Sequence, residues 1–353
     1  MKLEKMSLVY AMTSAVLFGV SIPLAKLLIE DISPVALAGL LYLGAFVGLS
    51  LYSFMSKKNE IGIYEKDAKL TRTDLPWLIG AIVTGGIIGP ISMMIGLTFI
   101  SGLSASLLLN LEGLATAVIA VFFFKENAGK RFWLALVCMT MAGVFLTWQP
   151  NQNNFSLTGP LLIILAMICW GIDNNLTRII SDKNPIQISK IKGLVAGVTS
   201  LLLALSLGAN LMLGIKIIFA LLLGAFSYGI SLVFFIKALK GLGSSRTGMF
   251  FSLAPFIGAI VSIIILKEPI QWTLLPTICL MIIGIWLINN ERHEHEHLHL
   301  SITHVHSHNH SDMHHTHEHS ELTQGQHAHE HTHPEISHTH IHWPDTQHRH
   351  KHI

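Results

Sequence analysis

Carboxylic acids are rare inside the apolar stretches of this sequence, and two of them lie far from any end of such a stretch. Glu112 lies within the apolar segment 101–124, and Asp173 lies within the apolar segment 157–180. A charged side chain near the centre of a membrane-spanning helix costs about 2.5 to 3.5 kcal/mol on insertion scales. Each acid is therefore expected either to stabilise the packing of helices or to line a pathway.

Two interpretations of Glu112 stay open. Its carboxyl group can be protonated and hydrogen-bonded within a helix bundle, or it can bind a coupling proton or cation. At a rise of 1.5 Å per residue, Glu112 lies about 18 Å and Asp173 about 10 Å from the C-terminal ends of their segments. These depths let both acids face one cavity.

More polar residues follow Asp173 directly. Asn174 and Asn175 cannot both share its helical face at 100° per residue, so at least one of them is expected to hydrogen-bond to another helix. Packing between helices and contact with a solute remain alternatives for both, and Arg178 is either a snorkelling anchor or a ligand. The candidate residues for binding a substrate or a coupling ion are Asn110, Glu112, Asp173, Asn174, Asn175, Arg178, Tyr228 and Ser231.

Histidine is confined to the end of the chain, where all 22 histidines lie between His293 and His352, chiefly as His-x-His. Alternate residues of an extended chain project to the same side, so neighbouring imidazoles can converge on one ion. Imidazole suits divalent transition metals, and the tail is expected to bind Ni²⁺, Co²⁺ or Zn²⁺, whereas no other cofactor is expected. The candidate metal ligands are His293, His295, His297, His299, His304, His306, His308, His310, His327, His329, His331 and His333.

The tail holds few large apolar residues, so it cannot build a core and is expected to be disordered without metal. An alternative is that it binds metal in solution without a cellular role.

The composition indicates the class of protein that must position these residues. Hydrophobic residues make up 51% and charged residues 12% of the 353 residues, which is typical of a chain whose solvent is lipid. A soluble enzyme and a nucleic-acid partner are not expected, and no catalytic constellation or phosphate-binding loop is present. Ten apolar segments are long enough to span a bilayer: 8–29, 34–55, 76–98, 101–124, 131–148, 157–180, 186–207, 213–237, 243–266 and 270–289. The sequence thus predicts an all-α integral membrane protein.

Lysine and arginine predict the orientation of these segments. With the N-terminus in the cytoplasm, cytoplasmic segments hold twenty of these residues, Lys190 and Lys192 among them, and the opposite side holds three, Lys26, Lys216 and Lys267. This bias follows the positive-inside rule. A multi-pass protein of the cell membrane, with both termini cytoplasmic, is therefore expected.

The two halves of the apolar part are related. Phe18–Lys26 and Trp170–Arg178 share an aromatic-Gly start, a Leu and a terminal cation at an offset of 152 residues. Each half holds five segments, an odd number, so the second half must be inverted in the membrane. The expected units are a first repeat over 1–148, a second repeat over 149–290 and a histidine-rich cytoplasmic tail over 291–353.

These features resemble the drug/metabolite transporter superfamily, in the branch with two EamA repeats, over residues 8–289. The resemblance is carried by the paired aromatic-Gly helices and by two motifs, NLEGLATAVIAVFFFKE at 110–126 and SLAPFIGAIVSIIILKE at 252–268. It implies a ten-helix secondary transporter, of a kind that mostly exports small metabolites. The second motif has Pro255 where family helices commonly have proline, and the first has Gly113, so the segment 101–124 is expected to be the straighter of the two.

The histidine-rich tail makes the chain similar to a subgroup associated with nickel or cobalt resistance. The leading hypothesis is therefore export of a divalent transition-metal ion, with the tail collecting or sensing it. One alternative is export of a small metabolite, such as an amino acid or a nucleoside, with a regulatory tail. Another is a membrane-anchored metal buffer or sensor without transport.

Overall fold

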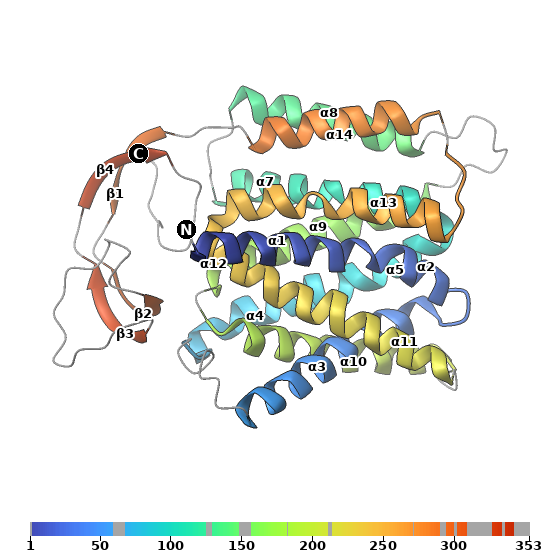
Figure 1. Cartoon of the computed structure of the whole chain (residues 1–353), viewed down its shortest axis with the longest axis horizontal. Coiled ribbons are helices and arrows are strands. Elements are labelled where there is room, and N and C mark those ends of the chain that lie inside the picture. The colour runs from blue at the N-terminus through green and yellow to red at the C-terminus, as the bar shows by residue number, and fades with distance from the viewer. Residues whose placement is uncertain are drawn as a thin grey trace.

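Apolar segments of this sequence become the helices of a single bundle (Figure 1). A computed structural model describes residues 2–58, 68–124, 129–147, 157–181, 183–210, 214–270, 272–289, 294–299, 302–308, 327–333 and 336–341.

The helices of the first half are α1 (Lys2–Gly19), α2 (Ser21–Leu28), α3 (Pro34–Lys58), the 3₁₀-helix η1 (Arg72–Asp74), α4 (Leu75–Ala81), the π-helix η2 (Ile82–Ile88), α5 (Gly89–Phe99), α6 (Gly102–Leu108), α7 (Asn110–Phe124) and α8 (Lys130–Thr147). Those of the second half are α9 (Thr158–Ile179), α10 (Pro185–Ser206), α11 (Ile215–Leu223), the π-helix η3 (Gly224–Ile230), α12 (Ser231–Phe251), α13 (Ala254–Ile265) and α14 (Leu274–Asn289).

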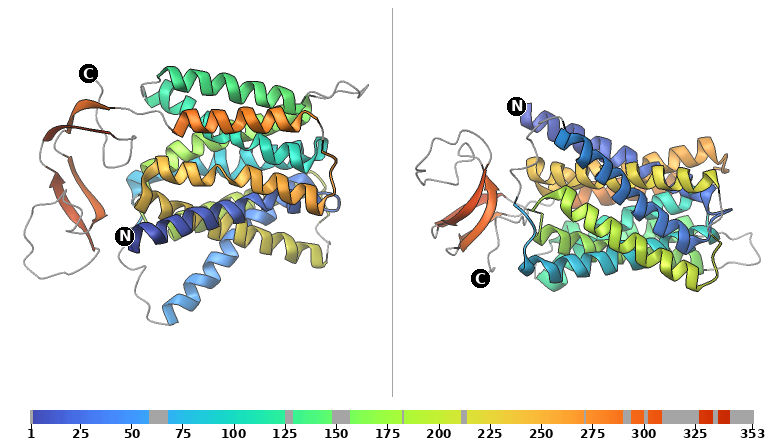
Figure 2. Two further views of the ribbon diagram at one scale, coloured as in Figure 1. Left: turned by 45° about the horizontal axis from the view of Figure 1, so that its top comes forward. Right: turned by 90° about the horizontal axis from the view of Figure 1, so that it is seen from below.

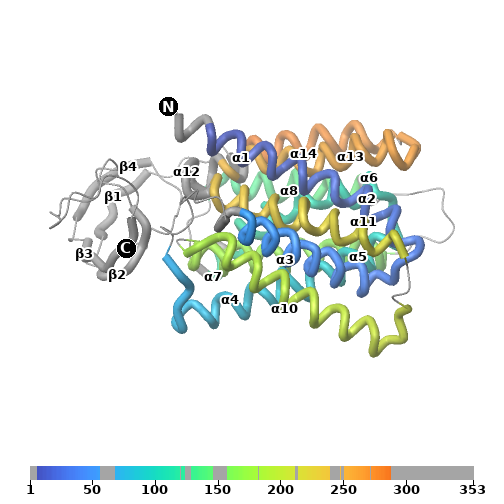
Figure 3. The backbone as a smooth tube through the Cα atoms, turned by 60° about the horizontal axis from the view of Figure 1, so that its bottom comes forward, coloured from blue at the N-terminus to red at the C-terminus, as the bar shows by residue number. Residues whose placement is uncertain are grey.

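Helical segments suited to a bilayer match the expected all-α membrane fold. Within the described residues, seven helical segments are long and apolar enough to span a membrane, and two shorter apolar helices, Ala254–Ile265 and Leu274–Leu287, accompany them. The 18-residue helix α8 packs against α14, and the helices run roughly along one axis (Figures 2 and 3). The multi-pass character predicted from hydropathy is confirmed.

The chain reverses its direction within α12. Phe235 and Phe251 are 16 residues apart and would lie about 24 Å apart on a straight helix, yet their ring centroids are 4.8 Å apart. The expected segments 213–237 and 243–266 therefore meet within α12, between Phe235 and Phe251.

A π-helix interrupts the third helical segment beside Pro90. The backbone N–H of Gly89 donates to the carbonyl of Thr84, five residues earlier, but Pro90 has no N–H to donate to Gly85. The Gly85 carbonyl instead accepts hydrogen bonds from the Tyr42 hydroxyl at 2.6 Å and from the Trp170 indole N–H at 3.1 Å. These hydrogen bonds connect α3, through Tyr42, and α9, through Trp170, to the π-helix η2.

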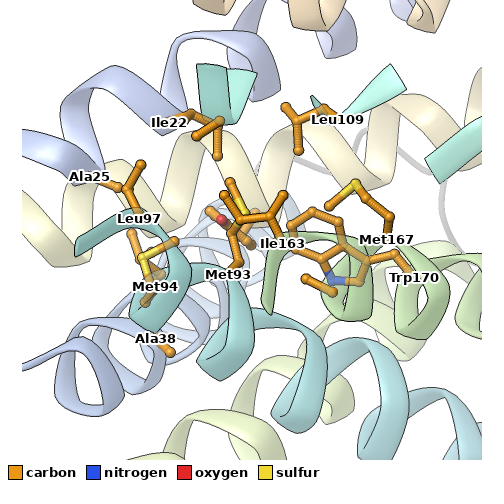
Figure 4. Packing of buried hydrophobic residues seen from close by; sticks show 14 of the residues in the cluster. Ile22, Ala25, Ala38, Met93, Met94, Leu97, Leu109, Ile163, Met167 and Trp170 are labelled. Carbon is orange, nitrogen blue, oxygen red and sulfur yellow. The ribbon is translucent and has the colours of Figure 1, made fainter. Parts of the chain in front are cut away.

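Helices at the centre of the bundle pack closely. Met93 and Met94, on α5, are fully buried beside Met167 and Trp170, so the methionine pair belongs to the core rather than to a solute route (Figure 4). Elsewhere, glycines let the backbones of neighbouring helices approach each other closely, as is common between helices in membranes. A Cβ atom on Gly197 of α10, for example, would lie 2.7 Å from the backbone nitrogen of Leu43 in α3.

Charged residues fix the joint between α5 and α6. The Lys26 ammonium donates to the carbonyl oxygens of Leu97 at 2.6 Å and Ile100 at 2.8 Å, at the C-terminal end of α5. The Glu268 carboxylate accepts from the backbone N–H groups of Gly102 and Leu103, each at 2.7 Å. Both charges match the helix dipoles they face, so Lys26 stabilises a helix end.

Parts of the histidine-rich tail are β-strands. Strand β1 (Glu294–His299) pairs with β4 (Ile336–Ile341), and β2 (Ile302–His308) pairs with β3 (His327–His333), both antiparallel. In these segments the structure differs from the expected disorder, because a residue type that recurs at every second position matches the period of a strand. Register places His304 opposite His331 and His306 opposite His329.

Candidate functional site

A polar cavity of about 210 Å³ lies inside the helix bundle, between the two halves of the chain. Its lining residues come from α1, α7, α9, α12 and α13 and from the joints that precede α7 and α13. They are Phe18, Leu109, Asn110, Glu112, Gly113, Thr116, Asn174, Asn175, Arg178, Phe235, Phe251, Ser252, Ala254 and Pro255.

Interrupted helices meet at this cavity. The fourth helical segment breaks at Leu109, between α6 and α7, and the corresponding segment of the second half breaks between Phe251 and Ala254. Because both segments are interrupted, the expectation that Gly113 leaves the segment 101–124 the straighter of the two stays a prediction. The interruption at Leu109 has a physical reason in Asn110, whose amide N–H donates to the Leu107 carbonyl at 3.2 Å and competes with the helical backbone hydrogen bonds.

Glu112 occupies the first turn of α7 and lines the cavity. The N-terminal end of a helix carries partial positive charge and favours a carboxylate there. The Asn174 amide N–H group donates to Glu112 Oε1 at 2.9 Å and also lies 3.2 Å from Thr116 Oγ1. Asn174 therefore joins α9 to the acid of α7.

The second asparagine strengthens the same contact between α7 and α9. Asn175 donates to the backbone carbonyls of Thr116 at 3.0 Å and of Gly171 at 2.9 Å. A Cβ atom on Gly171 would lie 2.9 Å from the backbone nitrogen of Thr116, so the two helices touch through their backbones. Both asparagines thus bond across helices, and both line the cavity together with Arg178.

Aromatic rings form another part of the lining. The centroid of the Phe18 ring lies 5.5 Å from that of Phe251, which in turn lies 4.8 Å from that of Phe235. The cavity therefore combines carboxylate and amide groups from α7 and α9 with apolar ring faces from α1 and α12.

Asp173 is directed away from this cavity and is not among its lining residues. Its carboxylate Oδ2 forms a buried ion pair with the Lys192 ammonium of α10, and Oδ1 accepts from the Thr177 hydroxyl at 2.9 Å. The side chain also abuts Gly85 of η2, where no Cβ atom would fit. The two acids thus occupy separate polar sites on either side of α9.

Lys192 is the residue that the sequence analysis missed, because it was counted among the cytoplasmic lysines. It is only 3% exposed and lies seven residues after Pro185, the first residue of α10. Its position inside the apolar segment 186–207 is the signal that could have identified it as a partner for an acid within the membrane.

Tyr228 and Ser231 lie outside the cavity as well. The Tyr228 ring packs against those of Phe18 and Tyr42, with centroids 5.9 and 5.4 Å away. The Ser231 hydroxyl donates to the Ser14 carbonyl at 3.0 Å, joining α12 to α1. In this conformation both residues contribute to helix packing.

The candidate metal ligands belong to the tail. His293 and His310 lie outside the described residues, and the other ten are on β1, β2 and β3. In the described part of the helix bundle, no three His, Cys, Asp or Glu side chains are close enough together to hold a metal ion.

A larger groove, of about 510 Å³, lies between α1, α2, α11 and η3. Its lining is apolar except for Ser227, and it includes side chains such as Phe219 and Phe226 that are half exposed on the outside of the bundle. In a bilayer such a surface contacts lipid. The polar cavity is therefore the better candidate for binding a solute.

Comparisons with known proteins find one matching family model and relatives named as transporters. The family model described as "EamA-like transporter family" matches residues 5–149 and 157–290. An uncharacterized transporter of Methanothermobacter thermautotrophicus is 29% identical over 272 residues, covering 73% of this chain and 78% of the relative. The uncharacterized transporter YetK of Bacillus subtilis is 23% identical over 278 residues, covering 76% and 82%.

One solved structure supports the same architecture. A crystal structure of another protein matches with a TM-score of 0.59 and 15% identity, and the match covers 80% of this chain and 95% of that one. At this identity the likeness concerns the fold alone.

Proposed function

The chain belongs to the EamA-like transporter family, and from this premise we propose that it moves a small solute across the membrane by secondary active transport through the Glu112 cavity. The observation that carries the proposal is the meeting of two interrupted helices at one polar cavity. Transporters with inverted repeats commonly bind their cargo where such helices break near the midplane. The family is one of transporters, and no catalytic role is proposed.

The proposed direction is export, with both termini in the cytoplasm as the lysine and arginine bias favours. Alternating exposure of the cavity to the two sides of the membrane would carry the solute. A proton or another ion moving down its gradient would drive the cycle, with Glu112 as its binding group.

Gly113 offers a direct test of the cavity, because a Cβ atom there meets nothing within 4 Å. Gly113→Ala is expected to retain transport, whereas Gly113→Leu is expected to fill the cavity and lower the transport rate by about tenfold, equivalent to about 1.4 kcal/mol of lost binding. Solute uptake into proteoliposomes measures both variants.

The matched control is Gly143→Leu. A Cβ atom at Gly143 is also uncrowded, with its nearest neighbours 4.0 Å away, and Gly143 does not line the cavity. This variant is expected to transport normally. Equal transport by both leucine variants would exclude this cavity as the route.

A small metabolite is the cargo that the cavity supports best. Three phenylalanine rings suit an apolar portion of an organic solute, and the carboxylate and amide groups suit its polar portion.

A divalent nickel, cobalt or zinc ion is the second candidate cargo, favoured by the histidine-rich tail. The cavity itself supports it less, because no histidine or cysteine lines it and Glu112 is its one carboxylate among the described residues. The tail is proposed to bind these metals at the cytoplasmic surface and to regulate transport.

Deleting residues 291–353 is expected to remove most binding of Ni²⁺, Co²⁺ and Zn²⁺ and to abolish the response of transport to these metals, while solute transport without metal stays near its full rate. Calorimetric titration of the purified protein with Zn²⁺ and uptake into proteoliposomes measure the two properties. If the truncated protein still lowers cellular nickel, cobalt or zinc, the metal ion is the cargo. If metal handling disappears and the tail alone restores it, the protein is a metal buffer or sensor.

A further inference from the structure

Hydrogen-bond donors of the cavity asparagines are already used within the protein. Asn174 donates to Glu112 and Thr116, and Asn175 donates to the Thr116 and Gly171 carbonyls. Asn110 donates to the Leu107 carbonyl and to Met281 Sδ at 3.4 Å. What these amides leave for a solute is therefore their oxygen atoms.

Among these acceptors, Asn110 Oδ1 is the buried oxygen atom that lacks a hydrogen-bond donor in the described part of the chain. Asn110 is 6% exposed and lines the cavity, and its amide oxygen accepts no hydrogen bond from any described residue. A buried polar atom without a partner is costly, so such an atom in a binding cavity indicates a missing donor. Two residues further along α7, the Glu112 carboxylate supplies a second acceptor and a negative charge.

The aromatic part of the lining suits an apolar body attached to such a donor. Phe18, Phe235 and Phe251 supply three neighbouring rings in one row. The Arg178 guanidinium also lines the cavity but is engaged in another interaction of the protein. The volume of about 210 Å³ corresponds to about seven water molecules, enough for one small organic ion.

We propose that the cavity binds a small organic ammonium ion, a protonated amine with an apolar body, whose N–H groups donate to Glu112 and to Asn110 Oδ1. The apolar body lies against the phenylalanine row. This inference rests on the proposed function and gives its cargo a chemical class.

Three probes with the same apolar body and different polar ends test the proposal: phenethylamine, 2-phenylethanol and 3-phenylpropionate. The full-length protein, purified in detergent, is titrated with each probe by calorimetry at neutral pH. Phenethylamine is expected to bind at least about tenfold more tightly than either of the others, because hydrogen bonds between charged groups are the stronger ones. Equal or tighter binding of the alcohol or the carboxylate overturns the proposal.

Variants locate the binding. Glu112→Gln is expected to abolish the preference for phenethylamine, and Asn110→Leu is expected to weaken its binding about fivefold, the equivalent of one ordinary hydrogen bond. Glu30→Gln, a matched change of an exposed acid outside the cavity, is expected to change neither. A preference that survives Glu112→Gln overturns the assignment.

Transport separates this inference from the proposed function. If phenethylamine binds in a manner sensitive to Gly113→Leu but neither it nor any other solute of a panel of amines, other metabolites and divalent metals crosses the membrane of proteoliposomes, the ammonium site stands and the transport proposal fails. If a solute of another class is transported with the same sensitivity and phenethylamine does not bind, transport stands and the ammonium proposal fails.

Discussion

Replacing Glu112 by Gln is expected to abolish solute transport while leaving the protein folded. The amide oxygen of Gln can still accept the hydrogen bond that Asn174 donates to Glu112 Oε1, so the contact between α7 and α9 is kept. What disappears is the negative charge that binds the cargo or the coupling ion. Losing one hydrogen bond to a charged group costs about 1.5 to 3 kcal/mol, which corresponds to a loss of about ten- to hundredfold in affinity.

The measurement is uptake into proteoliposomes across an imposed pH gradient, over a panel of amines, other metabolites and divalent metals. Glu30→Gln serves as the control, because Glu30 is exposed outside the cavity. Thermal unfolding of both variants should match that of the unchanged protein. Full-rate transport by Glu112→Gln would remove Glu112 from the mechanism and leave the cavity as a packing defect.

The helices and the two related halves of this fold were predictable, because hydropathy and sequence repetition are patterns that extend over whole segments. Apolar runs of spanning length predicted the helices, and the paired aromatic-Gly helices predicted a membrane fold of two related halves. The helix break at Leu109 was not predicted, because Asn110 acts on the Leu107 carbonyl only in one side-chain conformation. Hydropathy averages over such local competition.

The π-helix at Ile82–Ile88 illustrates a similar limit. A kink in this helix is indicated by the sequence, through Gly85, Gly86, Gly89 and Pro90. The hydrogen bonds that the released Gly85 carbonyl accepts, however, come from Tyr42 and Trp170 on two other helices. Partners that come from 43 and 85 residues away cannot be read from a local pattern.

The lining of the candidate cavity was predicted in part. Glu112, Asn110, Asn174, Asn175 and Arg178 lie around one cavity, and their polarity within apolar segments was the signal. Depth along a helix follows from residue counting, but the partner that each helical face meets follows only from packing.

That distinction explains Asp173. At 100° per residue its face differs from that of Asn174, and it meets α10 and η2 instead of α7. Lys192 compensates its charge, so among the described residues Glu112 is the acid left for the cavity.

Breaking the Asp173–Lys192 ion pair on one side is expected to destabilise the bundle severely. Lys192→Met keeps the unbranched shape of the side chain but lacks the ammonium, which leaves the Asp173 carboxylate without its counter-ion at a site where the Lys192 and Asp173 side chains are 4% and 10% exposed. Removing one partner of a buried pair costs about 3 to 5 kcal/mol. Reversible unfolding in detergent should show this loss in the free energy of unfolding, and Asp173→Asn should show a similar one.

The double variant, Asp173→Asn with Lys192→Met, distinguishes charge from shape. It buries no uncompensated charge, and replacing both members of a buried pair by neutral groups is often close to neutral. The double variant is therefore expected to be more stable than either single variant, with a coupling energy of about 1 to 3 kcal/mol between the two positions. If the two losses simply add, the ion pair does not hold α9 to α10. Transport by a stable double variant would further show that Asp173 acts through packing, leaving Glu112 to bind the cargo.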